Sequence, residues 1–402
     1  MTRTLEVYLN LKHVGTLTET NGKSLSFTYS DDVSTPISLS MPIENKTYNK
    51  NIVTPFFENL LPEGDIIKTI ASVYLVSEKN PFSLLNIIGE DCAGAIHLSN
   101  KNIESKEFPY PKELSTDDFH SLLHKYDNGV PYYQKGMRLS LAGAQNKTTL
   151  ILRDDIYYIP NFKFPSTHII KFINPIAPNI LLNEFFCTEL AKSLGINVSS
   201  MEIKKSTNYL YLLIERFDRI KNNADIKRIH QEDFCQILSV KPTNKYQEEG
   251  GPSFIKIVDA LKSYSSSPLD LILLAKISVY NYLIGNCDYH GKNLSLLHIN
   301  NSYKLSPFYD LVSTRIYEEL SHNMAMSINK KYDFDKINKQ DIEKELTSWG
   351  LNGPKLLKKI VKDFKYIINN AKEIQLKENL LSESKEINNI IRIIEENYKK
   401  LT

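Results

Sequence analysis

The segment GNCDYHGKN at residues 285–293 holds the residues whose types and spacing best suit catalysis. Asp288 and Asn293 are five positions apart. This spacing occurs in loops where an aspartate accepts a proton from an attacking hydroxyl and an asparagine holds a magnesium ion. Lys292 would neutralise phosphate charge beside them. Because asparagine, aspartate and glycine also favour turns, the segment taken alone is equally consistent with a polar turn that caps a helix.

A second aspartate favours phosphoryl transfer over a simple turn. Residues 303–311, YKLSPFYDL, are strand-like and place Asp310 near the end of the strand. A magnesium site of this kind needs a second metal-binding aspartate after a strand, so we expect Asn293 and Asp310 to hold Mg²⁺ on the triphosphate of ATP. The alternative is that Asp310 caps a helix that begins at the next residue.

Lys171 is a candidate for the strand cation that a triphosphate requires, because it lies within the apolar run STHIIKF. Glu184, on the following helix, is its candidate ion-pair partner. The alternative is a lysine whose stem lies on apolar surface while its ammonium reaches water. The segment LLIERFDR at residues 212–219 lies at a strand end, where backbone groups could meet an adenine edge. A strand end with solvated charges is the alternative there.

The stretch RLSLAGAQNKTTL at residues 138–150 is the candidate phosphate loop. It has one glycine between small residues, and Lys147 follows four positions later. It lacks the second glycine of GxxxxGK[ST], so it is not a Walker loop, and a simple hairpin turn is the alternative in isolation. Small residues at positions 142–144 would let backbone N–H groups approach phosphates closely.

The elements that must position these residues change along the chain. Short alternating segments in residues 1–50 predict an antiparallel meander, and the longer period over residues 52–90 predicts helices. Strand patterns return after a polar linker near residues 99–118, and they fade again beyond residue 228. Further helices are expected in three apolar-periodic stretches, which are 180–194, 254–284 and 335–402.

Composition excludes several classes of protein. The 402 residues are 42% hydrophobic and carry a net charge of +2, so no global basic field indicates nucleic acid as the main ligand. The four cysteines are far apart, which argues against a disulfide framework or a zinc site. The motif HQED at residues 230–233 has one histidine beside two acids, too few ligands to predict a metal site. The N-terminus lacks an apolar signal region, and the longest apolar run is too short to cross a bilayer, so we expect a cytoplasmic bacterial protein.

Seven motifs occur in the order in which they are found in HipA-type serine/threonine kinases, the toxins of HipBA toxin–antitoxin modules. They are RLSLAGAQNKTTL, STHIIKF, LLIERFDR, HQEDFCQ, KYQEEGGPS, IGNCDYHGKNLSL and LSPFYDL. The segments VYLNLKHVGTL and FFENLLPEGDIIK also resemble the N-terminal subdomain of that family. The resemblance covers nearly the whole chain and is weakest after about residue 325.

The resemblance implies an α+β, bilobal, protein-kinase-like fold. Its β-rich N-terminal region would include an extra N-terminal subdomain, and its C-terminal lobe would be all-helical. The expected domains are an N-terminal HipA-type subdomain at 1–110, a kinase N-lobe with phosphate loop and hinge at 111–219, and a helical C-lobe with the catalytic loop at 220–402.

The resemblance also implies roles for individual residues. Asp288 would be the catalytic base, Lys171 would contact the nucleotide phosphates, and Ser140 would be autophosphorylated. The phosphate loop would comprise Ala142, Gly143, Ala144, Gln145, Asn146 and Lys147, and the hinge against adenine would comprise Glu215, Arg216 and Phe217. The phosphate and magnesium end would be lined by His290, Gly291, Lys292, Asn293, Tyr309 and Asp310. The chain departs from the family in having Tyr289 and Gly291 where a glycine and an alanine are expected.

The implied activity is that of an ATP- and Mg²⁺-dependent protein serine/threonine kinase, a phosphotransferase of EC 2.7.11.1 type. As a toxin it would phosphorylate a translation-related protein, with an aminoacyl-tRNA synthetase as candidate, and switch itself off at Ser140. Its expected partner is a HipB-like antitoxin, and the chain would contact operator DNA only through that antitoxin. No membrane is expected to be involved. The alternatives are an antitoxin-binding transcriptional co-repressor with minor kinase activity and a small-molecule kinase. The sequence leaves open whether the chain is exported into a host cell.

Overall fold

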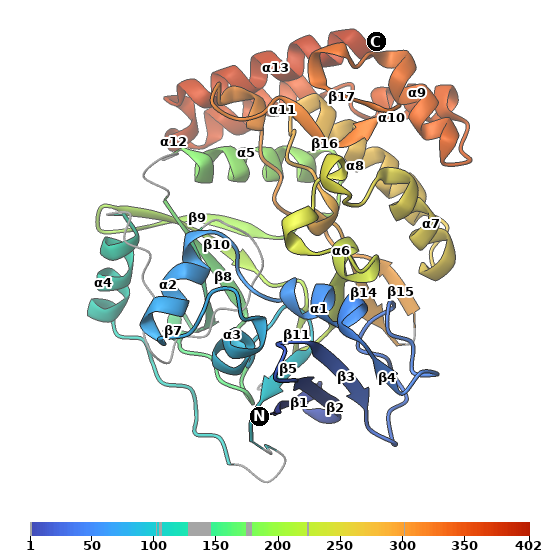
Figure 1. Cartoon of the computed structure of the whole chain (residues 1–402). Coiled ribbons are helices and arrows are strands. Elements are labelled where there is room, and N and C mark those ends of the chain that lie inside the picture. Colours follow the sequence, from blue (N-terminus) through green and yellow to red (C-terminus); the bar gives the residue numbers. More distant parts are fainter. Residues whose placement is uncertain are drawn as a thin grey trace. The chain divides into compact units, whose positions relative to one another are not determined.

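The computed structural model describes residues 2–101, 103, 107–127, 146–173, 179–222, 225–300 and 302–402 (Figure 1). The chain divides into two compact units. Unit 1 comprises Met1–Pro178, Ser200–Thr243 and Leu297–Asn301, and unit 2 comprises Asn179–Ser199, Asn244–Leu296 and Ser302–Thr402. Each unit therefore gathers segments that are far apart in the sequence.

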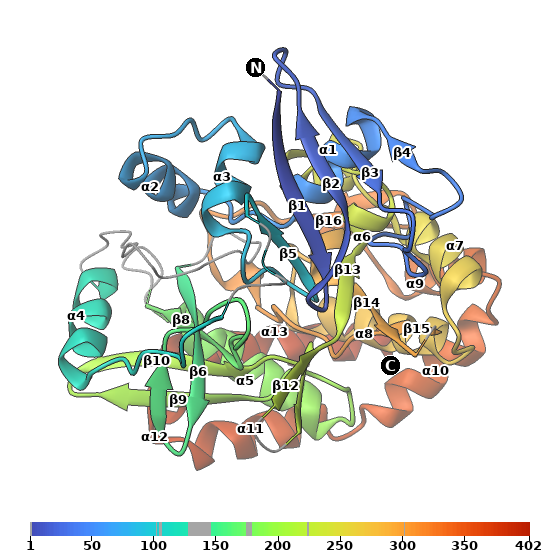
Figure 2. The ribbon, with the colours of Figure 1, turned by 90° about the horizontal axis from the view of Figure 1, so that it is seen from below.

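The first sheet of unit 1 is the antiparallel meander that the alternation in residues 1–50 predicts, extended by one later strand. Its strand order is β4-β3-β2-β1-β5, and Figure 2 shows β1, β2 and β3 side by side. The strands are β1 Arg3–Leu9, β2 Lys12–Glu19, β3 Leu25–Tyr29, β4 Thr47–Tyr48 and β5 Ile96–Ser99. Three helices pack their apolar faces into the same core, and they are α1 Lys50–Glu58, α2 Asp65–Val73 and α3 Pro81–Ile88. Phe27, Phe56 and Phe57 are completely buried there.

The second sheet of unit 1 has the order β7-β6-β8-β10-β9 and is antiparallel throughout. Its strands are β6 Lys147–Arg153, β7 Ile156–Tyr158, β8 His168–Phe172, β9 Met201–Ser206 and β10 Tyr209–Glu215. Asp154 and Asp155 join β6 to β7 with φ values of 50° and 60°, the backbone that a tight two-residue hairpin requires. Helix α4 (Thr116–Asp127) packs on β8 and β10, and Tyr126 stacks on Phe172 at 4.0 Å between ring centroids.

Short elements complete unit 1 after β10. They are β11 Arg219–Asn222, β12 Asp225–Arg228, β13 His230–Asp233 and α6 Phe234–Ile237. Strands β11 and β12 pair with each other as an antiparallel hairpin. Asp233 and Gln236 form a reciprocal capping box at the start of α6, which satisfies two backbone N–H groups that the helix itself cannot pair.

Unit 2 is mainly helical. Its helices are α5 Ile180–Ser193, α7 Phe254–Tyr264, α8 Asp270–Ile284, α9 Lys339–Ser348, α10 Gly353–Asp363, α11 Ile367–Lys377, α12 Asn379–Ser382 and α13 Lys385–Leu401. Helix α8 is buried on most sides and packs against α13, as the continuous apolar run in its sequence predicts. None of the helices in the described part of the chain is long and apolar enough to cross a membrane.

The prediction that residues 220–402 are all-helical is wrong in one respect, because this range also contains strands. Besides β12 and β13 it holds β14 Ser295–Ile299, β15 Ser302–Leu305, β16 Asn323–Ile328 and β17 Lys331–Asp333. Strands β16 and β17 form a hairpin turned by Asn329 and Lys330, whose φ values are 50° and 64°. A run as short as NMAMSI, which forms β16, cannot be distinguished from a buried helical segment by periodicity.

Candidate active site

The loop that carries Asp288 begins where α8 ends. Gly285 has φ 71°, a left-handed conformation that glycine adopts without the Cβ clash other residues meet, and it terminates the helix. The Asn286 side-chain oxygen then accepts a hydrogen bond from the Asp288 N–H at 3.0 Å. A 3₁₀ turn over Gly291–Asn293 follows and leads into β14. The backbone thus turns back within the five positions that separate Asp288 from Asn293.

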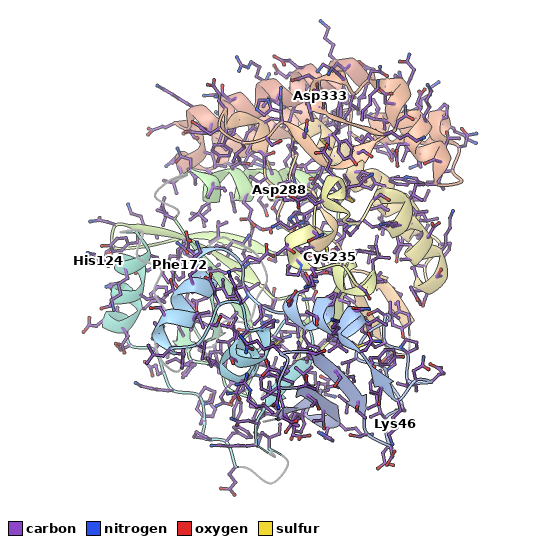
Figure 3. All side chains as sticks on the ribbon, in the orientation of Figure 1. Lys46, His124, Phe172, Cys235, Asp288 and Asp333 are labelled. Atoms are coloured by element: carbon purple, nitrogen blue, oxygen red, sulfur yellow. The ribbon has the colours of Figure 1, made fainter. Side chains whose placement is uncertain are left out.

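Asn293 closes this loop onto Asp288. Its Nδ2 donates to the Asp288 main-chain oxygen at 3.1 Å, so its amide oxygen is the atom that can ligate a metal. His290, Lys292 and Asn293 are buried, whereas the Asp288 side chain, labelled in Figure 3, is 50% exposed. The loop therefore presents one accessible carboxylate on a buried frame, which is what a general base needs to meet an incoming hydroxyl.

Asp310 is tied to the same loop through its neighbour Tyr309. The Tyr309 hydroxyl donates to the Lys292 carbonyl at 2.7 Å and lies 2.6 Å from the Ser295 hydroxyl. Asp310 itself has φ 56°, a conformation that is uncommon for residues other than glycine and that concentrates at functional sites. Amide and carboxylate oxygens are ligands that Mg²⁺ prefers, so the donor types of Asn293 and Asp310 fit the predicted magnesium pair.

Burial keeps two other groups of the loop protonated. It raises the pKa of the Cys287 thiol to about 11 and holds the pKa of the Tyr289 hydroxyl well above its ordinary value. Neither group therefore ionises near neutral pH. Asp288 remains the accessible acid–base group of the segment Cys287–Tyr289.

In unit 1, the sheet places two buried lysines opposite each other. Lys147 on β6 and Lys171 on β8 are direct cross-strand partners, and they are 6% and 5% exposed. The alternative of a Lys171 ammonium that reaches open water does not fit this burial. A polyanionic ligand would interact favourably with two cations on neighbouring strands. Both residues are among those that the sequence assigned to nucleotide phosphates.

The predicted hinge Glu215–Phe217 begins at the end of β10. Its Arg216 side chain is buried and donates two hydrogen bonds to Asp218, at 2.9 and 2.7 Å. The main-chain N–H groups of Glu215 and Arg216 donate to the carbonyls of Ser200 and Thr167. A nucleotide base would therefore have to use other backbone groups of this segment, and the Arg216 guanidinium serves the fold.

A buried cluster of five charged groups holds the predicted hinge segment in place. The sequence alone does not indicate this cluster. Asp91 and Asp218 lie among the guanidinium groups of Arg216, Arg219 and Arg228, with separations of 2.7–4.0 Å. Burial alone would raise the pKa of Asp91, but the three neighbouring arginines lower it on balance. The signal lay in ERFDR, where closely spaced charges follow a buried strand, but their partner Asp91 is more than a hundred residues away.

The remaining predicted residues are placed only in part. Ser140 and Ala142–Gln145 lie outside the described residues. Asn146 precedes β6, and its carbonyl accepts from the Phe172 N–H at 3.0 Å. Glu184 lies on α5 and is 1% exposed. It belongs to unit 2 whereas Lys171 belongs to unit 1, and their ion pair stays a prediction.

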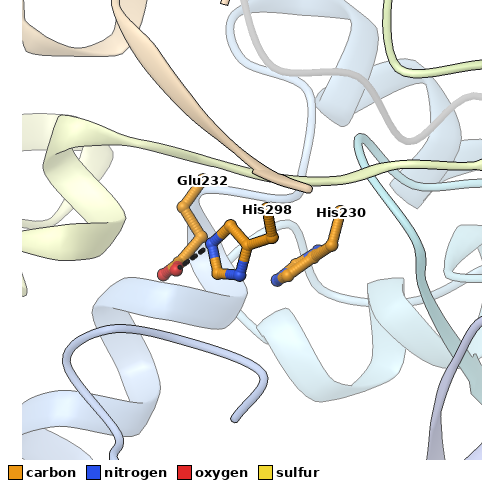
Figure 4. Close-up of side chains that lie close together, drawn as sticks. All are labelled: His230, Glu232 and His298. Carbon is orange, nitrogen blue, oxygen red and sulfur yellow. Dashed lines mark ion pairs between the residues drawn. The ribbon is translucent and has the colours of Figure 1, made fainter. Parts of the chain in front are cut away.

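A second polar cluster in unit 1 joins His230 and Glu232 to His298 (Figure 4). One ligand-type atom from each lies within 4.8 Å of the others, and His298 Nε2 is 2.9 Å from Glu232 Oε1. These groups hold the segment Ile37–Leu39, because Glu232 accepts from the Ser38 hydroxyl and the Leu39 N–H, and His230 donates to the Ile37 carbonyl. Burial, followed by the neighbouring His298, lowers the pKa of His230 to about 4. His298 lies on a separate strand, β14, so the pattern around His230 in the sequence does not indicate it.

Two family models match the chain. The HipA-like C-terminal domain matches residues 139–371, more than half of the chain, and the HipA N-terminal domain matches residues 5–99. The chain belongs to the HipA family. Both matches agree with the motifs that indicated this family, and the HipA resemblance is confirmed.

Individual HipA-family relatives match across most of the chain. The Y4mE protein of Sinorhizobium fredii is 37% identical over 344 residues, covering 82% of this chain and 81% of its own. The serine/threonine-protein kinase toxin HipA of Shewanella oneidensis is 29% identical over 357 residues, covering 84% and 81%. The solved structure of the Shewanella oneidensis HipA, HipB and operator DNA complex matches with a TM-score of 0.85 at 25% identity, covering 98% of this chain and 97% of that one. The α+β, HipA-like fold is therefore confirmed.

Proposed function

We propose that this HipA-family chain is an ATP-dependent protein serine/threonine kinase with Asp288 as its general base. The observation that carries the proposal is the geometry of the loop Asp288–Asn293. One exposed carboxylate stands on a frame that an asparagine closes by a 3.1 Å hydrogen bond. The similarity over 84% of this chain to a protein named as a serine/threonine-protein kinase toxin supports the same reaction class.

Each residue has a chemical task in this reaction. Asp288 accepts the proton of a serine or threonine hydroxyl while the hydroxyl oxygen attacks the γ-phosphorus of ATP and the bond to ADP breaks. Lys147 and Lys171 bind the nucleotide phosphates as a pair of cations. Asn293 and Asp310 would hold Mg²⁺, which when bound neutralises charge that develops on the phosphate oxygens.

We further propose that the phosphate loop at 142–147 cradles the phosphates and that Ser140 is its switch. A phosphate on Ser140 would add about −1.5 to −2 charges next to groups that bind another phosphate. It should therefore repel the nucleotide and lower ATP affinity. Calorimetric titration of the phosphorylated and unphosphorylated forms with ATP tests this idea, and equal affinities would contradict it.

The biological role that we propose is that of a toxin which phosphorylates a translation-related protein, with an aminoacyl-tRNA synthetase as the candidate class. Comparative phosphoproteomics of cells that express either the wild-type chain or Asp288→Asn tests this role directly. We expect a small set of serine or threonine sites that are phosphorylated only with the wild-type chain. Identical phosphoproteomes and identical growth would contradict the proposal.

A co-repressor role is the second candidate, and the matched complex of HipA with HipB and operator DNA is the observation that favours it. In this role a HipB-like antitoxin would bring the chain to DNA, and kinase activity would be minor. Retention of the chain on operator DNA only when a HipB-like protein is present would support it. Growth arrest that requires Asp288 but no antitoxin would favour the kinase.

A further inference from the structure

Tyr246 contacts the group that we propose as the general base. Its hydroxyl donates a hydrogen bond to Asp288 Oδ1 at 2.7 Å, although the two residues are 42 positions apart. Tyr246 belongs to the motif KYQEEGGPS, which has no chemical role in the reaction described above. We propose that Tyr246 is a positioning residue for phosphoryl transfer, holding the Asp288 carboxylate in the orientation that accepts the substrate proton. This inference rests on the proposed function of Asp288.

The exposed carboxylate of Asp288 needs such a support. The main chain of Asp288 is fixed at both its N–H and its carbonyl, by Asn286 and Asn293. The side chain is nevertheless half exposed, and a carboxylate there is free to rotate unless a donor holds it. A carboxylate has two oxygens with about four acceptor positions. Tyr246 engages Oδ1, and Oδ2 remains a suitable acceptor for the incoming proton.

Tyr246 is itself held by a closed turn. The Gly251 N–H donates to the Tyr246 carbonyl at 2.9 Å. The next side chain, Gln247, donates to the Ser327 hydroxyl at 3.0 Å and accepts from the Ser327 N–H at 2.9 Å, which fastens the turn to β16. The Tyr246 ring also meets the buried His290 ring edge-on, with centroids 5.5 Å apart. These contacts hold the Tyr246 hydroxyl in place beside Asp288.

The rest of the motif packs directly on the catalytic loop. A Cβ at Gly251 would lie 2.5 and 2.6 Å from the carbonyls of Asn244 and Tyr246, so the turn accepts no side chain at this position. Pro252 occupies the space that a Cβ on Gly291 would fill, at 2.5 Å from the proline Cγ. The segment Tyr246–Pro252 thus supports both the base and the turn that follows it.

A gating role would make the opposite prediction. If the Tyr246 hydroxyl occupied the position beside Asp288 that the substrate hydroxyl must take, removing the tyrosine hydroxyl would accelerate phosphoryl transfer. In the positioning role Tyr246 stays protonated, the substrate proton moves to the free Asp288 oxygen, and removing the tyrosine hydroxyl slows transfer. The sign of the effect therefore separates the two roles.

The test uses Tyr246→Phe in the full chain, which removes only the hydroxyl and keeps the ring against His290. Tyr264→Phe is the matched control, because Tyr264 is the last residue of α7 and is 39% exposed. Incorporation of label from γ-labelled ATP with Mg²⁺ is followed for both variants, the wild-type chain and Asp288→Asn. We expect Tyr246→Phe to lower the rate at saturating ATP about tenfold, as the loss of one charge-assisted hydrogen bond would. The half-saturating ATP concentration and the melting temperature should match those of Tyr264→Phe.

The outcomes separate this inference from the function on which it rests. An inactive Asp288→Asn together with a Tyr246→Phe variant as fast as wild type, or faster, overturns the positioning role alone. A Tyr246→Phe defect confined to ATP affinity, or accompanied by a lower melting temperature, also overturns it, because a merely structural role would produce that result. A fully active Asp288→Asn overturns the proposed function and this inference together.

Discussion

Replacing Gly291 by alanine should disable the catalytic loop through a single methyl group. The added Cβ would lie 2.5, 2.9 and 3.3 Å from the Cγ, Cβ and Cδ atoms of Pro252. The shortest of these separations is about 0.9 Å below the 3.4 Å at which ordinary contact begins. Either the turn Gly291–Asn293 or the proline must move by that amount. Overpacking of this kind costs roughly 1–3 kcal/mol of unfolding free energy.

The effect on activity should exceed the effect on stability. A displacement near 1 Å in a catalytic group can reduce a rate by about 100-fold, and the turn connects directly to Asp288. The assay is label transfer from γ-labelled ATP at saturating ATP, combined with urea unfolding. Gly22→Ala is the control, because no atom lies within 4 Å of the Cβ it would add.

A second substitution tests whether the clash is the cause. Pro252→Gly removes all three ring atoms that the alanine methyl would meet, so the double variant should recover most of the activity that Gly291→Ala loses. A double-mutant cycle isolates this coupling from the cost of Pro252→Gly itself. A Gly291→Ala variant as active and stable as Gly22→Ala would refute the reasoning. So would a double variant that is no better than the product of the two single effects.

Three further predictions follow from the same structure. Lys147→Met and Lys171→Met should each raise the half-saturating ATP concentration about tenfold or more, and an unchanged ATP dependence in both would contradict a phosphate role. Asp310→Asn should abolish label transfer at ordinary Mg²⁺ while leaving the melting temperature within a few degrees of wild type, and full activity would show that Asp310 is no metal ligand. Burial lowers the pKa of His168 and His230 in the folded chain to about 4. Because the unfolded chain would bind these protons near pH 6.5, the free energy of unfolding should be highest above pH 6.5 and should fall as the pH drops toward 4. Urea unfolding should therefore show roughly 2 kcal/mol less stability per histidine at pH 5 than at pH 7.5, a difference that His168→Gln should reduce, and equal stability at both pH values would contradict the sign.

The parts of the site that could be predicted are those that local sequence determines. The separation of Asp288 and Asn293 defines a turn that can close on itself, and the structure closes it with a hydrogen bond between the two. Lys171 could be recognised because a lysine within an apolar strand indicates either an anionic partner or a side chain that reaches water. Its position opposite Lys147 depends on the register of β6 against β8, which periodicity does not define.

The parts that were missed depend on contacts between distant segments. Tyr246 reaches Asp288 across 42 positions, and no pattern in KYQEEGGPS indicates that partner. His298 joins His230 and Glu232 from another strand in the same way. The departure at Gly291 also became intelligible only in three dimensions, because Pro252 leaves no room for the alanine that the family resemblance led us to expect.

The most direct test of the central claim is the rate at which the purified full chain incorporates label from γ-labelled ATP with Mg²⁺, compared between wild type and Asp288→Asn. Asp259→Asn, an exposed aspartate on α7, is the matched control for loss of one charge. We expect wild type and Asp259→Asn to label serine or threonine at equal rates, and Asp288→Asn to be at least about 100-fold slower. Labelling of Asp288→Asn at the wild-type rate would show that Asp288 is not the base.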